Sequence, residues 1–348
     1  MNEPNHAAAS NPSASPDPAA PASKKELPPL PELPPVEAPS AGFIVQLFVI
    51  PAIVVLVVIV VWLLFGKLAG GERDAMEYVR LIRASASNYR AANRAAFELA
   101  SLIQNDPKLA ADERLVGELT DILEHDLDDV ENAEMTQYVA LALGRFNTLE
   151  GRSATGQKVD VLAALCRAVE AKYPDPVRIA AAASLAKHAA RLDGKLDDAK
   201  AVAALAAAGK SGEPAVRQTA TYALGFFGGE ASTQALRAQL EDADRYVRYN
   251  AAVALTRRDD PAALGTLKEM LTTADLDRLI ELPSAAEKQT QIEAIELEAL
   301  NALQTVANQG KTELLKSARA EVDGLTRSGL AGVRNNAQAV LKGLPASR

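Results

Sequence analysis

The fold is indicated most clearly by one stretch whose pattern returns along the chain. This stretch is Glu213-Pro-Ala-Val-Arg-Gln-Thr-Ala-Thr-Tyr-Ala-Leu-Gly225. Val216, Ala220 and Leu224 stand four residues apart, so they share one face of a helix, with a small residue in the middle. A small residue there lets a neighbouring helix approach closely. The stretch therefore predicts a helix that packs against others of its own kind.

The same arrangement, with Arg directly after the Val, begins again at Val177, Val247 and Val333. Looser copies without the Arg begin at Ala91, Met135 and Ile295. The starts lie 31 to 48 residues apart, which leaves room for a second amphipathic helix in each interval. We expect these second helices at 159–172, 197–208, 231–241, 262–271 and 311–323. The longest interval contains Thr272–Thr290 and must hold an insertion or an extra turn.

This repeat resembles HEAT repeats, in the bacterial style also seen in phycobilisome-lyase-like proteins. The motif that carries the resemblance is Asp/Glu-Pro-x-Val-Arg-x-x-Ala-x-x-Ala-Leu-Gly, matched best at 213–225. The resemblance covers residues 73–345 and is strongest at 175–255. It implies an all-α fold, a HEAT-like α-solenoid of stacked helical hairpins, each burying its apolar face only against its neighbours. The alternative is an unrelated alanine-rich helical bundle, which has the same helical periodicity.

Three segments precede the repeats. Residues 1–42 hold 11 of the 19 prolines among Ala, Ser, Glu and Asn, a composition that cannot bury enough apolar surface to offset chain entropy. We expect a disordered Pro/Ala-rich tail that acts as a spacer, although Lys25–Pro31 also fits a ligand pattern for SH3-like grooves. Residues 66–72 are predicted to be a short linker before the repeat domain at 73–345.

Residues Phe43 to Phe65, FIVQLFVIPAIVVLVVIVVWLLF, form an uncharged run of 23 residues. As a helix at 1.5 Å per residue it is long enough for a bilayer core of about 30 Å. The run predicts a single transmembrane helix in contact with lipid. Lys67, Arg73, Arg80 and Arg83 follow it closely, against Lys24 and Lys25 before it, so the positive-inside rule places the solenoid in the cytoplasm and the tail on the opposite side.

Composition excludes several functions. The net charge of −8 argues against a nucleic-acid partner, which needs an excess of Lys and Arg for phosphates. A single cysteine, Cys166, excludes an intramolecular disulfide framework and a thiolate metal cluster, and its apolar helical surroundings favour packing over nucleophilic chemistry. We expect no cofactor and no metal.

The motifs that could carry chemistry also fail. Gly151–Lys158 lacks the Lys directly after its second Gly and the preceding strand of a phosphate loop, so we interpret it as a linker between helices. The acidic run from Asp126 lacks the Gly and Glu of a calcium loop. No histidine is followed by Glu, so the iron ligands of the HEAT-like deoxyhypusine hydroxylases have no counterpart here.

Charged residues that repeat with the fold are the remaining candidates. Because Arg178, Arg217, Arg248 and Arg334 recur at one repeat position, we interpret them as a structural ladder, here called the arginine ladder, in which each guanidinium bonds an acid or turn carbonyl of the neighbouring unit. A second cluster is a candidate partner patch, consisting of Arg245, Tyr246, Tyr249, Arg257 and Arg258.

These observations favour a non-catalytic, membrane-anchored scaffold or adaptor that binds another protein along its curved surface. Two alternatives remain. One is a lyase-like or maturation-factor subunit that assists an enzyme, and the other is a structural envelope protein.

Overall fold

The computed structural model describes residues 53, 55–61, 74–84, 88–192 and 196–343, and the chain divides into two compact units, Met1–Gly71 and Glu72–Arg348. In the first unit Ile53 and residues 55–61 are helical with exposed side chains. The rest of the predicted transmembrane helix, the predicted tail and the predicted linker lie outside the described residues. Within the described part, no helix has the length and apolar character needed to cross a bilayer.

The second unit is built almost entirely from helices. Its α-helices are α3 (Ala75–Arg83), α4 (Tyr89–Asn105), α5 (Glu113–Asp126), α6 (Ala133–Leu143), α7 (Val161–Ala168), α8 (Asp175–Arg191), α9 (Ala199–Ala208), α10 (Pro214–Leu224), α11 (Gly229–Gln239), α12 (Arg245–Arg257), α13 (Leu264–Met270), α14 (Thr273–Leu279), α15 (Ala285–Asn308), α16 (Glu313–Ser317), α17 (Arg319–Leu325) and α18 (Ala331–Lys342). Its 3-10 turns are η3 (Leu109–Ala111), η4 (Val130–Asn132) and η5 (Pro261–Ala263), and its strands are β1 (Glu150–Arg152) and β2 (Lys158–Asp160).

Local sequence explains where many of these helices begin. Alanine, the best helix former, fills their interiors. Acidic side chains accept hydrogen bonds from the first free backbone N–H groups, as Asp160 does for α7, Asp198 for α9 and Asp244 for α12. Pro214 stands in the first turn of α10, where its missing N–H costs nothing.

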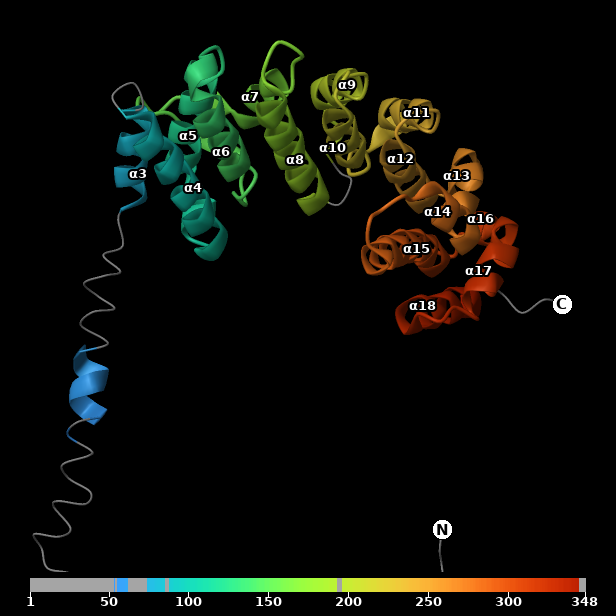
Figure 1. Cartoon of the computed structure of the whole chain (residues 1–348). Helices are drawn as coiled ribbons and strands as arrows, with labels where there is room; N and C mark the ends of the chain where they lie inside the picture. The colour runs from blue at the N-terminus through green and yellow to red at the C-terminus, as the bar shows by residue number, and fades with distance from the viewer. Residues whose placement is uncertain (1–52, 54, 62–73, 85–87, 193–195, 344–348) are drawn as a thin grey trace, which may run out of the picture. The chain divides into compact units, whose positions relative to one another are not determined.

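The helices form two layers, and the predicted α-solenoid is confirmed. Figure 1 shows α4, α6, α8, α10, α12, α15 and α18 following one another along the inner side of the arc, and each packs against the next. The outer layer consists of α3, α5, α7, α9, α11, α13 and α14, and finally α16 and α17. Each of the seven repeat starts expected from the sequence falls in one inner helix, and the expected second helices coincide with outer ones.

The repeat motif supplies the core between the layers. The residues corresponding to Val216, Ala220 and Leu224 are buried in α8, α10 and α12, and in α18 only Leu341 remains partly exposed. Glycines let inner helices approach closely. A Cβ on Gly144 would lie 2.4 Å from Ser184 Oγ of α8, and one on Gly225 would lie 3.0 Å from Ala254 Cβ of α12.

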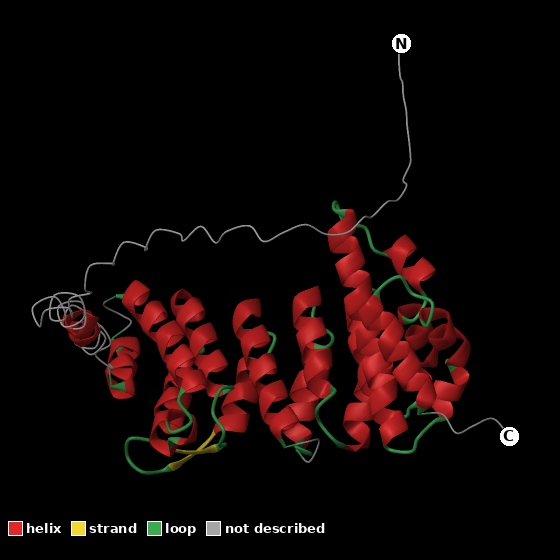
Figure 2. Cartoon of the chain, turned by 90° about the horizontal axis from the view of Figure 1, so that it is seen from below, coloured by secondary structure: helices red, strands yellow, loops and turns green. Residues whose placement is uncertain are grey.

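Two features depart from a regular array. The insertion expected near Thr272–Thr290 is α14 together with an early start of α15, ten residues before Ile295. The segment predicted to be a plain linker, Gly151–Lys158, belongs to an antiparallel β-hairpin that pairs Gly151 with Val159. Figure 2 shows this hairpin at one edge of the helical array. It packs on α5, where a Cβ on Gly117 would lie 1.8 Å from the Arg152 carbonyl oxygen.

Candidate functional site

The inner helices present one exposed stripe each. If the first core residue of each repeat is position 0 (Val177 in α8, Val216 in α10), positions 6 and 10 lie on the face that points away from the outer layer. Position 6 is apolar in five successive repeats: Phe97, Leu141, Ala183, Tyr222 and Val253. Phe97 and Tyr222 are 58% and 49% exposed, so two large aromatic side chains face solvent in this row, whereas Val253 is buried.

A groove lies between α4 and α6 around the first of these aromatics. The rings of Phe97 and Tyr138 meet edge to face, with centroids 5.6 Å apart. The groove has a volume of about 400 Å³, and its other lining residues are Tyr89, Arg90, Asn93, Arg94 and Glu134. Asn93 Nδ2 donates to Glu134 Oε2 at 2.6 Å across the groove. The site therefore offers aromatic surface with polar groups at its rim.

A second aromatic pair lies farther along the same face. The rings of Tyr222 and Phe226 on and after α10 meet edge to face at 5.0 Å. Tyr222 is at position 6 and Phe226 is at position 10 of this repeat. Exposed aromatic side chains of this kind are enriched at the centres of protein interfaces.

Position 10 carries cations in three of the five repeats, at Arg145, Lys187 and Arg257. Arg145 and Lys187 stand at the same position of two successive repeats, whose inner helices α6 and α8 pack against each other. Burial and the positive charge of Arg145 lower the pKa of Lys187. Within the described residues, none of the three side chains has an ion pair or hydrogen bond. We call Arg145, Lys187 and Arg257 the basic row.

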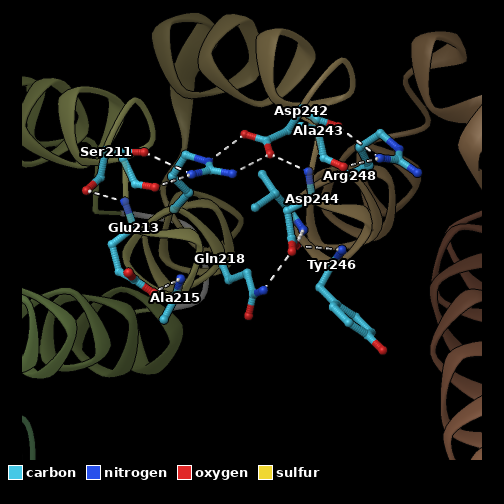
Figure 3. A network of polar contacts seen from close by, with 12 residues as sticks. Ser211, Glu213, Ala215, Gln218, Asp242, Ala243, Asp244, Tyr246 and Arg248 are labelled. Atoms are coloured by element: carbon cyan, nitrogen blue, oxygen red, sulfur yellow. Dashed lines mark hydrogen bonds and ion pairs between the residues drawn. The ribbon is translucent and has the colours of Figure 1, made fainter. Parts of the chain in front are cut away.

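The central contact of the arginine ladder joins Arg217 to Asp242 in the turn before α12. Figure 3 shows Asp242 together with its neighbours Ala243 and Asp244. Arg217 Nε and Nη2 donate to the two carboxylate oxygens at 2.8 and 2.9 Å, and Nη1 donates to the Ser211 carbonyl at 2.9 Å. Burial disfavours the charged form of Asp242, but its hydrogen bonds from Arg217 and from the Asp244 N–H together lower its pKa. The pair ties α10 to the following repeat.

The other ladder arginines are also bonded. Arg178 Nη1 donates to Ser211 Oγ of the next repeat at 3.0 Å, and Arg248 Nη2 lies 3.6 Å from Glu269 Oε1 on α13. Arg334, in the last repeat, donates to the Ser328 carbonyl at 2.7 Å. Glu296 takes the ladder position in α15, where it is fully buried and accepts a hydrogen bond from Thr273.

The five residues of the candidate partner patch do not share one place. Arg245, Tyr246 and Tyr249 lie in the first turns of α12, whereas Arg257 and Arg258 lie at its end. Tyr249 is 3% exposed and donates to Glu269 Oε1 at 2.6 Å. The guanidinium of Arg258 donates hydrogen bonds to the carbonyls of Leu224 and Phe227, so its donors are engaged within the protein. Of this set, Arg257 alone belongs to the inner-face rows.

Arg258 reveals a second set of contacts that the sequence analysis missed. The carbonyls it bonds are at positions 8 and 11 of the preceding repeat. At the same two positions of the repeat before α8, Leu143 accepts from His188 Nε2 at 3.0 Å and Phe146 accepts from Arg191. His188 and Arg258 both stand at position 11 of their own repeats, and Arg191 stands at position 14. A polar residue at position 11 is therefore the sequence signal that could have identified these contacts.

His188 has a defined tautomer in this arrangement. Its Nε2 carries the proton given to Leu143, and its Nδ1 accepts from Arg191 Nη2 at 2.9 Å. Burial, followed by the charge of Arg191, lowers its pKa to about 4. His188 is therefore neutral near pH 7 and acts as a helix cap.

Groups suited to catalysis are scarce in the described part of the chain. No three His, Cys, Asp or Glu side chains there are grouped to hold a metal ion. Burial, with smaller contributions from Asp198 and Asp160, raises the pKa of Cys166 to about 12, so its thiol stays protonated and is a poor nucleophile.

The family model for HEAT repeats matches residues 185–243 and 205–282. No curated protein sequence matches the chain.

The chain is similar to several solved structures at low sequence identity. One is an engineered protein of the Northeast Structural Genomics Consortium, which is 17% identical. The match covers 76% of this chain and 67% of the engineered protein, with a TM-score of 0.45. Computationally designed armadillo repeat proteins for modular peptide recognition match at 16% identity, over 78% of this chain and 100% of theirs, with a TM-score of 0.36. Human deoxyhypusine hydroxylase matches at 15% identity, over 80% and 98%, with a TM-score of 0.29. Residues 185–282 carry HEAT repeats, and the described helical unit is an α-solenoid of the HEAT and armadillo-like kind.

Proposed function

We propose that the chain is a non-catalytic scaffold whose inner face binds another protein. The observation that carries the proposal is the exposure of Phe97 beside Tyr138 in the groove between α4 and α6. An aromatic side chain left 58% exposed costs free energy in water, and a partner that covers it recovers that cost. Tyr222 extends the same row and gives the partner a second anchor.

A photo-crosslinking amino acid at position 97 tests this directly. The full chain with the probe in place of Phe97 should yield one dominant protein adduct in its native cells. The matched control carries the probe in place of Ala238, an exposed residue of the outer helix α11. Equal adduct patterns from both positions, or none from position 97, would contradict binding at the inner face.

We further propose that residues 43–65 attach this scaffold to a membrane, with the solenoid on the cytoplasmic side. The support is the uncharged 23-residue run and the excess of Lys and Arg that follows it. Extraction at alkaline pH should leave the chain in the membrane pellet, and release into the supernatant would refute attachment. A C-terminal alkaline phosphatase fusion should be inactive while a fluorescent-protein fusion is bright.

A further inference from the structure

The basic row gives the inner face a charge opposite to that of the chain. The whole sequence has a net charge of −8, yet Arg145, Lys187 and Arg257 stand in one row without a described counter-charge. Arg94 on the same face is, by contrast, paired with Glu98 at 2.7 Å. Cations that a fold leaves adjacent and unpaired repel each other, and an anionic partner removes that repulsion.

The basic row lies beside the apolar row at a constant offset. Arg145 and Lys187 follow the apolar residues Leu141 and Ala183 by four residues, which is one helical turn. Since successive inner helices pack side by side, both rows run across the helices rather than along them. A ligand that uses both rows must therefore cross several helices.

An extended peptide has the dimensions for this path. Packed helices lie about 8–10 Å apart, and an extended chain advances about 3.3 Å per residue, so roughly three residues cover one repeat. Alternate side chains of such a peptide point to opposite sides. Some can meet the aromatic row while others meet the cations.

We propose that the inner face from α4 to α12 binds an extended acidic segment of a partner protein, with large apolar side chains interspersed among its carboxylates. The inference rests on the proposed scaffold function and names the chemistry of its partner. Three cations are few for a nucleic acid, whose affinity comes from neutralising many phosphates, and the outer charge of the chain repels a polyanion.

The test uses the purified full chain and a fluorescein-labelled 15-residue peptide of repeated Asp-Phe-Glu. Fluorescence anisotropy should show saturable binding that weakens as salt is raised. A peptide with Lys in place of the acids, one with Ser in place of Phe, and a single-stranded oligonucleotide of equal length serve as comparison probes. The acidic aromatic peptide should bind at least about tenfold more tightly than each of these.

Charge reversal locates the site. The double variant Arg145→Glu, Lys187→Glu should weaken the peptide by about tenfold or more and flatten the salt dependence. Lys200→Glu, at an exposed lysine on the outer helix α9, reverses one charge where the double variant reverses two, and it should leave the affinity within about twofold. Unchanged melting curves and circular dichroism spectra show that each variant is folded.

Three results would overturn the proposal: unchanged affinity in the double variant, equal binding of the lysine peptide, or tighter binding of the oligonucleotide. These results leave crosslinking from position 97 intact, so they remove the acidic partner without removing the scaffold function. Absence of any crosslinked partner, by contrast, removes the scaffold function itself.

Discussion

At the scale of single residues, the solenoid uses cations as connectors between repeats. Arg217 joins its own helix to the turn before α12, and Arg258 joins α12 back to the end of α10. A guanidinium suits this work because its five donors lie in a rigid planar fork and stay charged at every relevant pH. Removing such a connector leaves buried acceptors unpaired, which costs more than the bond itself contributes.

Replacement of Arg217 by Ala should lower the free energy of unfolding by about 1–3 kcal/mol, because Asp242, with 11% of its side chain exposed, loses both of its charged donors. Urea denaturation of the 73–348 fragment measures this. Arg94→Ala breaks a pair whose arginine is 81% exposed and should leave the stability nearly unchanged. Unchanged stability together with lost partner binding would make Arg217 a recognition residue instead of a connector.

His188 should make the solenoid sensitive to acid. Its pKa is about 4 in the folded protein and 6.5 ordinarily, so between these values the unfolded chain binds the proton and the folded one does not. Stability is therefore lost as the pH falls from 6.5 towards 4, by roughly 2 kcal/mol at pH 5. His188→Gln, whose amide can still donate to Leu143, should remove this part of the pH dependence. Parallel profiles of both proteins between pH 7.5 and 5 would show that His188 does not contribute.

At the scale of elements, close approach decides how the inner helices stack. Gly144 and Gly225 stand at the same repeat position, and each faces a small residue of the next inner helix. A side chain at that point would push the helices apart, since buried backbone and a packed neighbour leave it no room. The glycine at the end of the repeat motif thus ends the helix and also lets the next inner helix pack closely against it.

Gly144→Ala should destabilise the fragment by about 1–3 kcal/mol, because its Cβ would overlap Ser184. Gly265→Ala is the matched control. It lies in α13 with nothing within 4 Å of the added Cβ, so it should stabilise by about 0.5–1 kcal/mol through the unfolded chain. Thermal melts of both variants decide the matter. Equal effects of the same sign would contradict this account of the packing.

Sequence periodicity was sufficient for the inner helices but not for everything between them. The spacing of Val216, Ala220 and Leu224 predicted burial because a helix places those positions on one face. The β1–β2 hairpin escaped prediction because its strands have three residues each and no alternating apolar pattern, and its place depends on Gly117 of another helix. Likewise, the sequence did not predict that Phe97 lies on the exposed face of α4. That position became clear only from its contact with Tyr138 of α6.

At the scale of the whole molecule, each repeat touches only its neighbours, so stability is a sum of repeats and junctions. The charge of the solenoid is also distributed repeat by repeat. Arg145, Lys187 and Arg257 lie on the inner face of the first five repeats, while the chain as a whole is acidic. The solenoid can therefore stay soluble through its net charge and still offer a basic surface.

Deleting residues 311–348 should leave the remaining repeats folded, because α16 to α18 pack only on the end of the array. The truncated fragment should keep its helical circular dichroism per residue and melt several degrees lower, since α15 loses the cover of α18. Collapse of the whole helical signal would show that the repeats are not independent in this way.

Glu296 in place of a ladder arginine has a mechanical consequence. Guanidinium contacts brace the junctions that follow α8, α10 and α12, but the buried carboxyl of Glu296 is engaged with Thr273 and braces nothing beyond α15. The ion pair between Lys268 and Glu321 is the described charged contact that holds α17 to α13. Under tension applied through the C-terminus, we therefore expect the final hairpin to separate before the repeats behind it. We expect a short early extension from this hairpin, while the inner face from α4 to α12 keeps its curvature.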